Sequence, residues 1–158
     1  MQRRAFAAAI SIGLPLALAL AAGASWAVGT DEDGPALDPD FAAGKRAIEA
    51  KDWRGAIKAL SSAALRDTRN ADIENYLGYA WRHAGDMNQA FAHYDRALKL
   101  DPRHRGAHEY AGEAALIAGD LARAQRHLAA LKSICLLPCD EYHELKAAIT
   151  AYRPPKAP

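Results

Sequence analysis

The chain has 158 residues, of which 51% are hydrophobic and 25% are charged, a composition typical of one folded globular domain. Its formal net charge is +1, and its first 27 residues carry two arginines and no acidic residue, so their removal would leave −1. A nucleic-acid-binding protein needs a basic balance or a basic face, and the sequence contains no block of five like charges. We therefore expect no nucleic acid as a partner.

Residues 1–27 have the pattern of a secretory signal peptide. Two arginines precede the uncharged apolar residues 5–22, and small residues allow cleavage after Ala27 or after Ala24. A retained membrane anchor is the alternative, because 18 uncharged residues are at the lower limit for spanning a bilayer. We expect cleavage, a periplasmic protein of a Gram-negative bacterium and no membrane span in the mature chain. Residues 28–36 are acidic and contain Gly and Pro, which predicts a short disordered lead-in.

A period of 34 residues organises the chain from residue 37 to residue 138. When residues 37–70, 71–104 and 105–138 are aligned, the same residue types stand at the same offsets. Each copy has glycine at its eighth offset and alanine at its twentieth, and Lys-Asp or Gly-Asp at its fifteenth and sixteenth. The recurring small residues are Gly44, Gly78 and Gly112, and Ala56, Ala90 and Ala124.

The middle copy shows that each period encodes two antiparallel helices. Its apolar residues recur at helical spacing through Leu77 and Trp81, stop near Gly85, and resume through Phe91 and Tyr94. The recurring small residues allow the two helices to approach closely. One such pair cannot bury its apolar face alone, so the pairs must stack on one another.

Residues 139–152 predict one more helix after the third copy. Asp140 suits the N-cap position, and Leu145 and Ile149 lie on an apolar face opposite charged residues. We expect this helix to be the polar cap that ends a solenoid. The remaining residues, 153–158, begin Arg-Pro-Pro and predict a disordered tail.

The middle copy, ENYLGYAWRHAGDMNQAFAHYDRALKLDP, resembles the tetratricopeptide repeat (TPR) family. The outer copies depart from the family pattern, with Lys51 in place of the turn glycine and Leu131 in place of a small residue. The resemblance implies an all-α fold, a right-handed α-solenoid of three helix-turn-helix repeats with a C-terminal capping helix. The residues of the middle copy that match the family signature are Leu77, Gly78, Trp81, Gly85, Asp86, Ala90, Tyr94, Ala97 and Pro102.

The resemblance also implies a concave groove, lined by the first helix of each pair, that binds a peptide or a partner protein. Aromatic rings there offer stacking area, Asn75 can bond an extended backbone, and Arg82 can face acidic groups. Any single one of these residues can equally be an ordinary exposed residue, so only their grouping on one face predicts binding. Carried over by position, the groove residues are Phe41, Lys45, Ile48, Asn75, Tyr79, Arg82, His83, Glu109, Glu113 and Leu116.

The sequence argues against catalysis and against the carboxylate clamp of some peptide-binding proteins. The sequence lacks a Gly-rich phosphate loop, a G-x-S-x-G elbow and an H-E-x-x-H motif. We therefore expect a non-catalytic module that binds a peptide or protein, with no cofactor and no metal. The carboxylate clamp, by which some family members hold chaperone C-termini, is also absent, because its positions carry Phe41, Lys45, Tyr76, Gly106 and Tyr110.

The only two cysteines, Cys135 and Cys139, lie where the third copy joins the capping helix. Thiols a few residues apart in an exported protein are expected to form a disulfide, which here would staple the cap to the solenoid. An inert reduced pair is one alternative. The other is a redox or metal-handling accessory protein that uses Cys135, Cys139 and His143.

Overall fold

The computed structural model describes residues 38–154. The predicted signal segment 1–27, the lead-in 28–36 and most of the tail 153–158 lie outside the described residues. Within residues 38–154 the chain forms seven helices, and the predicted all-α class is confirmed. The helices are α1 (Pro39–Glu49), α2 (Trp53–Arg66), α3 (Ala71–His83), α4 (Met87–Leu100), α5 (Arg105–Ile117), α6 (Leu121–Ile134) and α7 (Asp140–Ala151).

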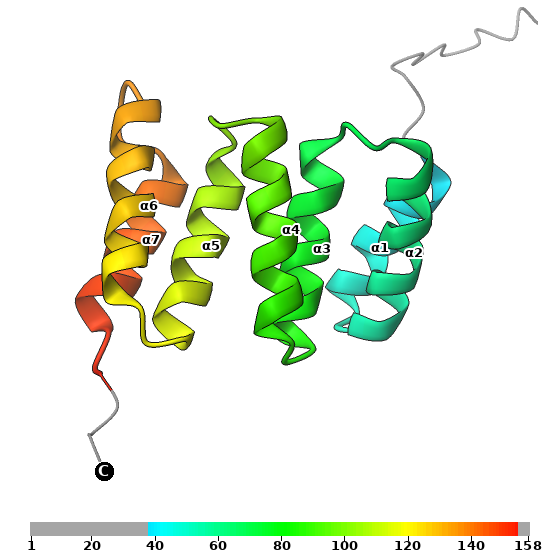
Figure 1. Ribbon diagram of the computed structural model, residues 1–158, viewed down its shortest axis with the longest axis horizontal. Coiled ribbons are helices and arrows are strands. Elements are labelled where there is room, and N and C mark those ends of the chain that lie inside the picture. Colours follow the sequence, from blue (N-terminus) through cyan, green and yellow to red (C-terminus); the bar gives the residue numbers. More distant parts are fainter. Residues whose placement is uncertain (1–37, 155–158) are drawn as a thin grey trace, which may run out of the picture. The chain divides into compact units, whose positions relative to one another are not determined.

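The helices pair as hairpins in chain order, α1 with α2, α3 with α4, and α5 with α6 (Figure 1). The pairs follow one another along the long axis of the unit that starts at Pro35, and α7 lies at the far end against α5 and α6. This arrangement of residues 38–154 confirms the predicted solenoid of three helix pairs and a capping helix.

The turn inside each hairpin combines a left-handed residue with a capping aspartate. The left-handed residues are Lys51, Gly85 and Gly119, with φ angles of 56°, 90° and 81°. This conformation costs glycine nothing but strains a residue with a Cβ, so the first hairpin turn is less favourable than the other two. The carboxylates that accept a hydrogen bond from a backbone N–H in the first turn of the second helix belong to Asp52, Asp86 and Asp120.

In the first and second hairpins, a glycine in the first helix allows the two helices to approach each other closely. A Cβ placed on Gly44 would lie 2.5 Å from Leu60, and one placed on Gly78 would lie 2.5 Å from Tyr94. Leu60 and Tyr94 are fully buried, so neither can move away without opening the core. The glycines thus fix the spacing between the two helices of each pair.

The capping helix packs more closely on α5 than the repeat pattern predicts. A Cβ on Gly112 would lie 2.5 Å from Leu145 of α7, whereas the matching glycines Gly44 and Gly78 face the second helix of their own pair. The N-cap of α7 is Cys139, without a side-chain cap bond, and the predicted N-cap Asp140 is the first helical residue. Glu144 of α7 lies beside Glu109 of α5.

The core lies between the first and second helices of the pairs. Alanines with no exposed surface fill the helix contacts, and larger apolar side chains fill the space between them. The fully buried large side chains are Tyr94, Leu60, Ile73, Leu77, Leu131 and Leu145. This packing leaves one surface of α1, α3 and α5 to carry aromatic and polar side chains.

Candidate functional site

A row of aromatic side chains crosses α1, α3 and α5. The ring centroids of Phe41 and Tyr76 are 5.7 Å apart, and those of Tyr79 and Tyr110 are 5.0 Å apart. Aromatic pairs at these distances stabilise the helix contacts and present a rigid apolar surface. We call this surface, from Phe41 to Tyr110, the α1–α3–α5 face.

His83 extends this row at the C-terminal end of α3. Its ring stacks on Trp53 of α2 at 4.5 Å and lies 4.4 Å from the ring of Tyr79. Partial burial and the neighbouring charge of Arg82 lower the pKa of His83 below its usual range. The imidazole is therefore neutral at pH 7 and packs here as one more aromatic ring.

Arg82 is the central cation of the face, and its side chain is only 8% exposed. Its Nη1 donates to the carboxylate of Glu113 on α5 over 2.6 Å. The guanidinium carbon lies 5.1 Å from the ring of Tyr79 and 5.5 Å from the ring of Tyr110. The Nη1 and the guanidinium face of Arg82 thus make contacts inside the chain, while its buried Nε has no hydrogen-bond partner among the described residues.

An open hollow of about 620 Å³ lies at the N-terminal ends of α3 and α5. Its wall holds Asn75, which is only 4% exposed and whose Oδ1 has no hydrogen-bond partner among the described residues. We call it the acidic hollow, because four of its residues are carboxylic acids. Its lining residues are Asp72, Asn75, Tyr76, Asp101, Arg103, His104, Arg105, Gly106, Glu109, Tyr110, Ile134 and Glu141.

Glu109 is the most deeply placed acid of this hollow, with 5% of its surface exposed. Burial, a hydrogen bond with Glu144 and the negative charges of Glu113 and Glu141 raise the pKa of Glu109 to about 8. Burial disfavours a charged carboxylate, and neighbouring carboxylates add repulsion. In the ligand-free protein, Glu109 is therefore mainly protonated at pH 7.

A second hollow, of about 360 Å³, lies at the C-terminal ends of α3 and α5. It is lined by Arg82, His83, Glu113, Leu116, Ile117 and Ala148. Ile117 is 65% exposed, so this end of the face offers apolar surface, whereas the acidic hollow offers polar groups.

The structure separates the predicted groove residues into two groups. Asn75 and Glu109 share the acidic hollow, and Arg82, His83, Glu113 and Leu116 share the second hollow.

The other predicted residues are less open. Phe41 is 6% exposed and Ile48 packs against the α1–α2–α3 core, so both are largely structural. Lys45 covers this end of the row, because its Nζ lies 5.9 Å from the ring of Phe41 and 5.8 Å from the ring of Tyr76.

Among the residues that line the acidic hollow, sequence reasoning predicted only Asn75 and Glu109, and it missed Tyr76, Tyr110 and Glu141 among others. The two tyrosines occupy the same offset in the second and third copies, and that recurrence is the signal that could have identified them. Glu141 is one of the charged residues that the sequence predicts opposite the apolar face of the capping helix. Its position in the hollow depends on how α7 packs against α5, which the repeat pattern does not specify.

The structure contains a disulfide between Cys135 and Cys139, whose Cα atoms are 6.0 Å apart. The bond closes a short loop that carries Leu136, fully exposed, and Leu137, 81% exposed. His143 is exposed and lies beside the ring of Tyr142 at 5.6 Å.

Residues 38–154 contain no cluster of three or more His, Cys, Asp or Glu side chains that could hold a metal ion. Over the same part of the chain, no helix is long and apolar enough to cross a membrane.

No protein-family model matches the chain. A curated TPR repeat-containing protein of Pseudomonas aeruginosa is 31% identical to it over 70 residues, which make up 44% of this chain and 67% of that protein. This similarity in sequence covers two thirds of the relative.

Solved structures share the fold at lower sequence identity. The type III secretion translocator chaperone SycD of Yersinia enterocolitica matches with a TM-score of 0.65 at 18% identity, over 72% of this chain and 80% of that chain. SycD in complex with a peptide of the translocator YopD matches with a TM-score of 0.62 at 18% identity, over 72% and 86%. The TPR2B domain of yeast Sti1, solved as a complex with pHsp70, matches with a TM-score of 0.65 at 21% identity, over 72% and 95%. The chain therefore belongs to the tetratricopeptide repeat family.

Proposed function

We propose that the protein is a non-catalytic scaffold that binds a peptide or a partner protein along a groove on the α1–α3–α5 face. The observation that carries this proposal is the amide of Asn75, which is buried in the wall of an open hollow without a partner for its Oδ1. A buried polar atom without a partner costs about 1–3 kcal/mol, so such atoms are rare unless a ligand or a water completes them. An extended peptide backbone supplies the N–H that this oxygen lacks.

Two further features support binding on this face. The aromatic row offers rigid side chains of the type that carry most binding energy in protein interfaces. Proteins of the same fold have been solved with a YopD peptide and with pHsp70, which shows that the fold is compatible with peptide binding.

We further propose that the protein acts in the bacterial periplasm or cell envelope, on the basis of the signal pattern in residues 1–27. Cell fractionation followed by N-terminal sequencing of the recovered protein tests this. We expect a mature chain that begins at Val28 or Ser25 in the periplasmic fraction. A chain that keeps residues 1–27 in the cytoplasm would contradict it.

A selection from a displayed random peptide library tests the binding proposal. The bait is the full chain, purified after expression with its own N-terminal segment. We expect selected peptides to lose at least tenfold in affinity with Asn75→Ala, whereas Asn88→Ala, at an exposed position of α4, leaves affinity unchanged. Circular dichroism confirms that both variants fold. Equal affinity for both variants, or no selected peptide at all, would overturn the proposal.

A further inference from the structure

We propose, on the basis of the binding face proposed above, that the acidic hollow receives a lysine or arginine side chain of the bound peptide, with Glu109 as its ion-pair partner. Three features of the hollow support this: the charges around Glu109, the buried amide of Asn75, and the rings of two tyrosines.

The groups around Glu109 are acidic on two helices. Glu113 comes from α5, and Glu141 and Glu144 come from α7. On α3 the hollow presents Asp72 and the neutral side chains of Asn75 and Tyr76. Glu113 is paired with Arg82, Glu141 with Arg105 and Asp72 with His104, so Glu109 and Glu144 are the acids of this group that have no basic partner among the described residues. A cation that enters the hollow therefore finds its attraction at Glu109 and Glu144.

The basic side chains on the wall do not neutralise Glu109. Arg105 lies 3.4 Å from Glu141, and His104 lies 3.0 Å from Asp72. The third basic residue, Arg103, donates to a backbone carbonyl of α6. Among the ion pairs of residues 38–154, none includes Glu109. Glu109 is thus a buried carboxyl without a cationic partner in the described structure, and a cation of the ligand would supply that partner.

The buried side-chain amide of Asn75 is the second observation that supports a cation site in the hollow. Its side-chain nitrogen lies close to α5, where a Cβ on Gly106 would be 3.3 Å away, and its Oδ1 has no partner in the described structure. Gly106 and Glu109 are one helical turn apart on α5, so the free oxygen and the carboxyl line the same hollow. An ammonium or guanidinium has several N–H donors, so it can reach both Glu109 and Oδ1 of Asn75, and the second lone pair of that Oδ1 can still accept from the peptide backbone.

Tyr76 and Tyr110 supply ring faces that attract cations. Lys45 already lies 5.8 Å from the ring of Tyr76, and Arg82 lies 5.5 Å from the ring of Tyr110, which shows that both rings accept cationic neighbours. Both rings also line the acidic hollow. The apolar stem of a lysine or arginine packs against such rings while its charged end reaches deeper groups.

Binding of this kind is linked to a proton. Glu109 is mainly protonated at pH 7 in the free protein, and a ligand cation favours its carboxylate. Cation binding therefore releases a proton from Glu109, and affinity increases as pH rises from 6 to 8. Other titratable and charged groups surround the same space, and their protons form the background against which this release is measured. They are Asp72, Asp101, Arg103, His104, Arg105, Tyr110, Glu113, Glu141 and Glu144.

The test uses two capped tripeptides that differ in one charge, acetyl-Ala-Lys-Ala-amide and acetyl-Ala-norleucine-Ala-amide, titrated into the full chain and followed by NMR. We expect the lysine peptide to shift the Asn75 side-chain amide and the backbone amides of Gly106 and Glu109. We expect it to bind at least fivefold more tightly than the norleucine peptide and several-fold more tightly at pH 8 than at pH 6. Glu109→Gln should abolish both differences, whereas Glu49→Gln, at an exposed position of α1, should keep them.

Equal binding of the two peptides, no shifts with either, or an unchanged preference in Glu109→Gln would overturn this inference. The library selection separates that failure from failure of the proposed function. Selected peptides that depend on Asn75 but contain no basic residue would leave the binding face in place and remove only the cation site. Glu109→Gln keeps the size of the side chain, and its melting temperature shows that it folds.

Discussion

The Nη1 atom of Arg82 lies 2.6 Å from the carboxylate of Glu113, and this pair joins the second and third repeats across the α1–α3–α5 face. The side chain of Arg82 is 8% exposed and that of Glu113 is 30% exposed, so the pair is screened less than a surface salt bridge. The charge of Arg82 is also held between the rings of Tyr79 and Tyr110.

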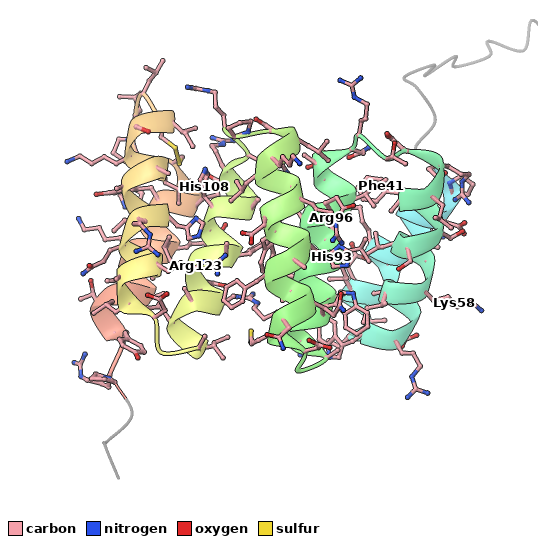
Figure 2. All side chains as sticks on the ribbon, in the orientation of Figure 1. Phe41, Lys58, His93, Arg96, His108 and Arg123 are labelled. Atoms are coloured by element: carbon pink, nitrogen blue, oxygen red, sulfur yellow. A yellow bond between two sulfur atoms is a disulfide. The ribbon has the colours of Figure 1, made fainter. Side chains whose placement is uncertain are left out.

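Removal of this cation is expected to destabilise the solenoid. Arg82→Ala leaves Glu113 without its partner and opens space between two rings, so we expect a loss of about 2–4 kcal/mol in the free energy of unfolding. Urea unfolding followed by circular dichroism measures it. Lys58→Ala, at an exposed position of α2 (Figure 2), is the control and should change stability by less than about 0.5 kcal/mol. If Arg82→Ala also lowers the free energy of unfolding by less than about 0.5 kcal/mol, the pair with Glu113 contributes little to stability.

The glycine contact in the second hairpin gives another prediction. Gly78→Ala places a methyl group about 2.5 Å from the buried ring of Tyr94, and we expect a loss of about 1–3 kcal/mol despite the better helix propensity of alanine. Gly106→Ala is the matched control, because its nearest neighbour is a side-chain nitrogen 3.3 Å away. Thermal unfolding of both variants compares them. If Gly78→Ala melts no lower than Gly106→Ala, the helices do not depend on this close approach.

Two histidines predict a decrease of stability in weak acid. His108 of α5 (Figure 2) faces His127 of α6, and the Nδ1 atoms of the two rings are 3.1 Å apart. Burial and the neighbouring His108 lower the pKa of His127 to about 4, so the unfolded chain binds more protons between about pH 4 and pH 6.5. The contribution of neutral His127 to the free energy of unfolding is therefore complete above about pH 6.5 and is lost as pH falls towards 4. We expect this loss to be about 1–2 kcal/mol, because partial exposure of His127 reduces the effect.

Unfolding midpoints measured from pH 7 to pH 4.5 test the histidine pair. His127→Gln removes the titrating group, so its free energy of unfolding should rise relative to that of the unchanged chain as pH falls from 7 to 4.5. This difference between the two profiles excludes the opposite contribution of Glu109, whose raised pKa favours the folded chain in the same range. Profiles of equal slope would mean that other groups cause the decrease.

The disulfide predicts a local effect at the capping helix. Replacement of Cys135 and Cys139 by alanine opens a loop of five residues, which lowers stability by about 2 kcal/mol at most. Hydrogen exchange should accelerate in α7 and stay unchanged in α1–α4, because contacts in a solenoid are made between neighbours. Reduction of the unchanged chain is the control and should give the same pattern. A global acceleration would show that the bond stabilises more than the cap.

Sequence reasoning predicted the elements that depend on local chemistry. Gly85 and Asp86 marked a hairpin turn because one supplies the left-handed backbone and the other the cap. The recurrence of Gly44 and Gly78 at one offset indicated the close helix contacts for the same reason, since only a missing side chain leaves room for Leu60 and Tyr94.

The contacts on the α1–α3–α5 face could not be predicted in the same way. Arg82 was expected to meet a partner, yet its distance to Glu113 depends on how the second and third pairs stack. Glu109 was expected on an open groove, yet it is 5% exposed, and its burial together with the neighbouring Glu144 of α7 raises its pKa. These relationships join residues more than 30 positions apart, and a 34-residue period specifies the helices without specifying such contacts.

The most direct test of the proposed binding face is an NMR map of the shifts that a selected peptide produces in the assigned chain. We expect the largest shifts on α3 and α5, at Asn75, Tyr79, Glu109 and Glu113. Shifts concentrated instead on α2, α4 and α6, at residues such as Lys58, Asp95 and Arg123, would contradict the assignment of this face as the binding surface.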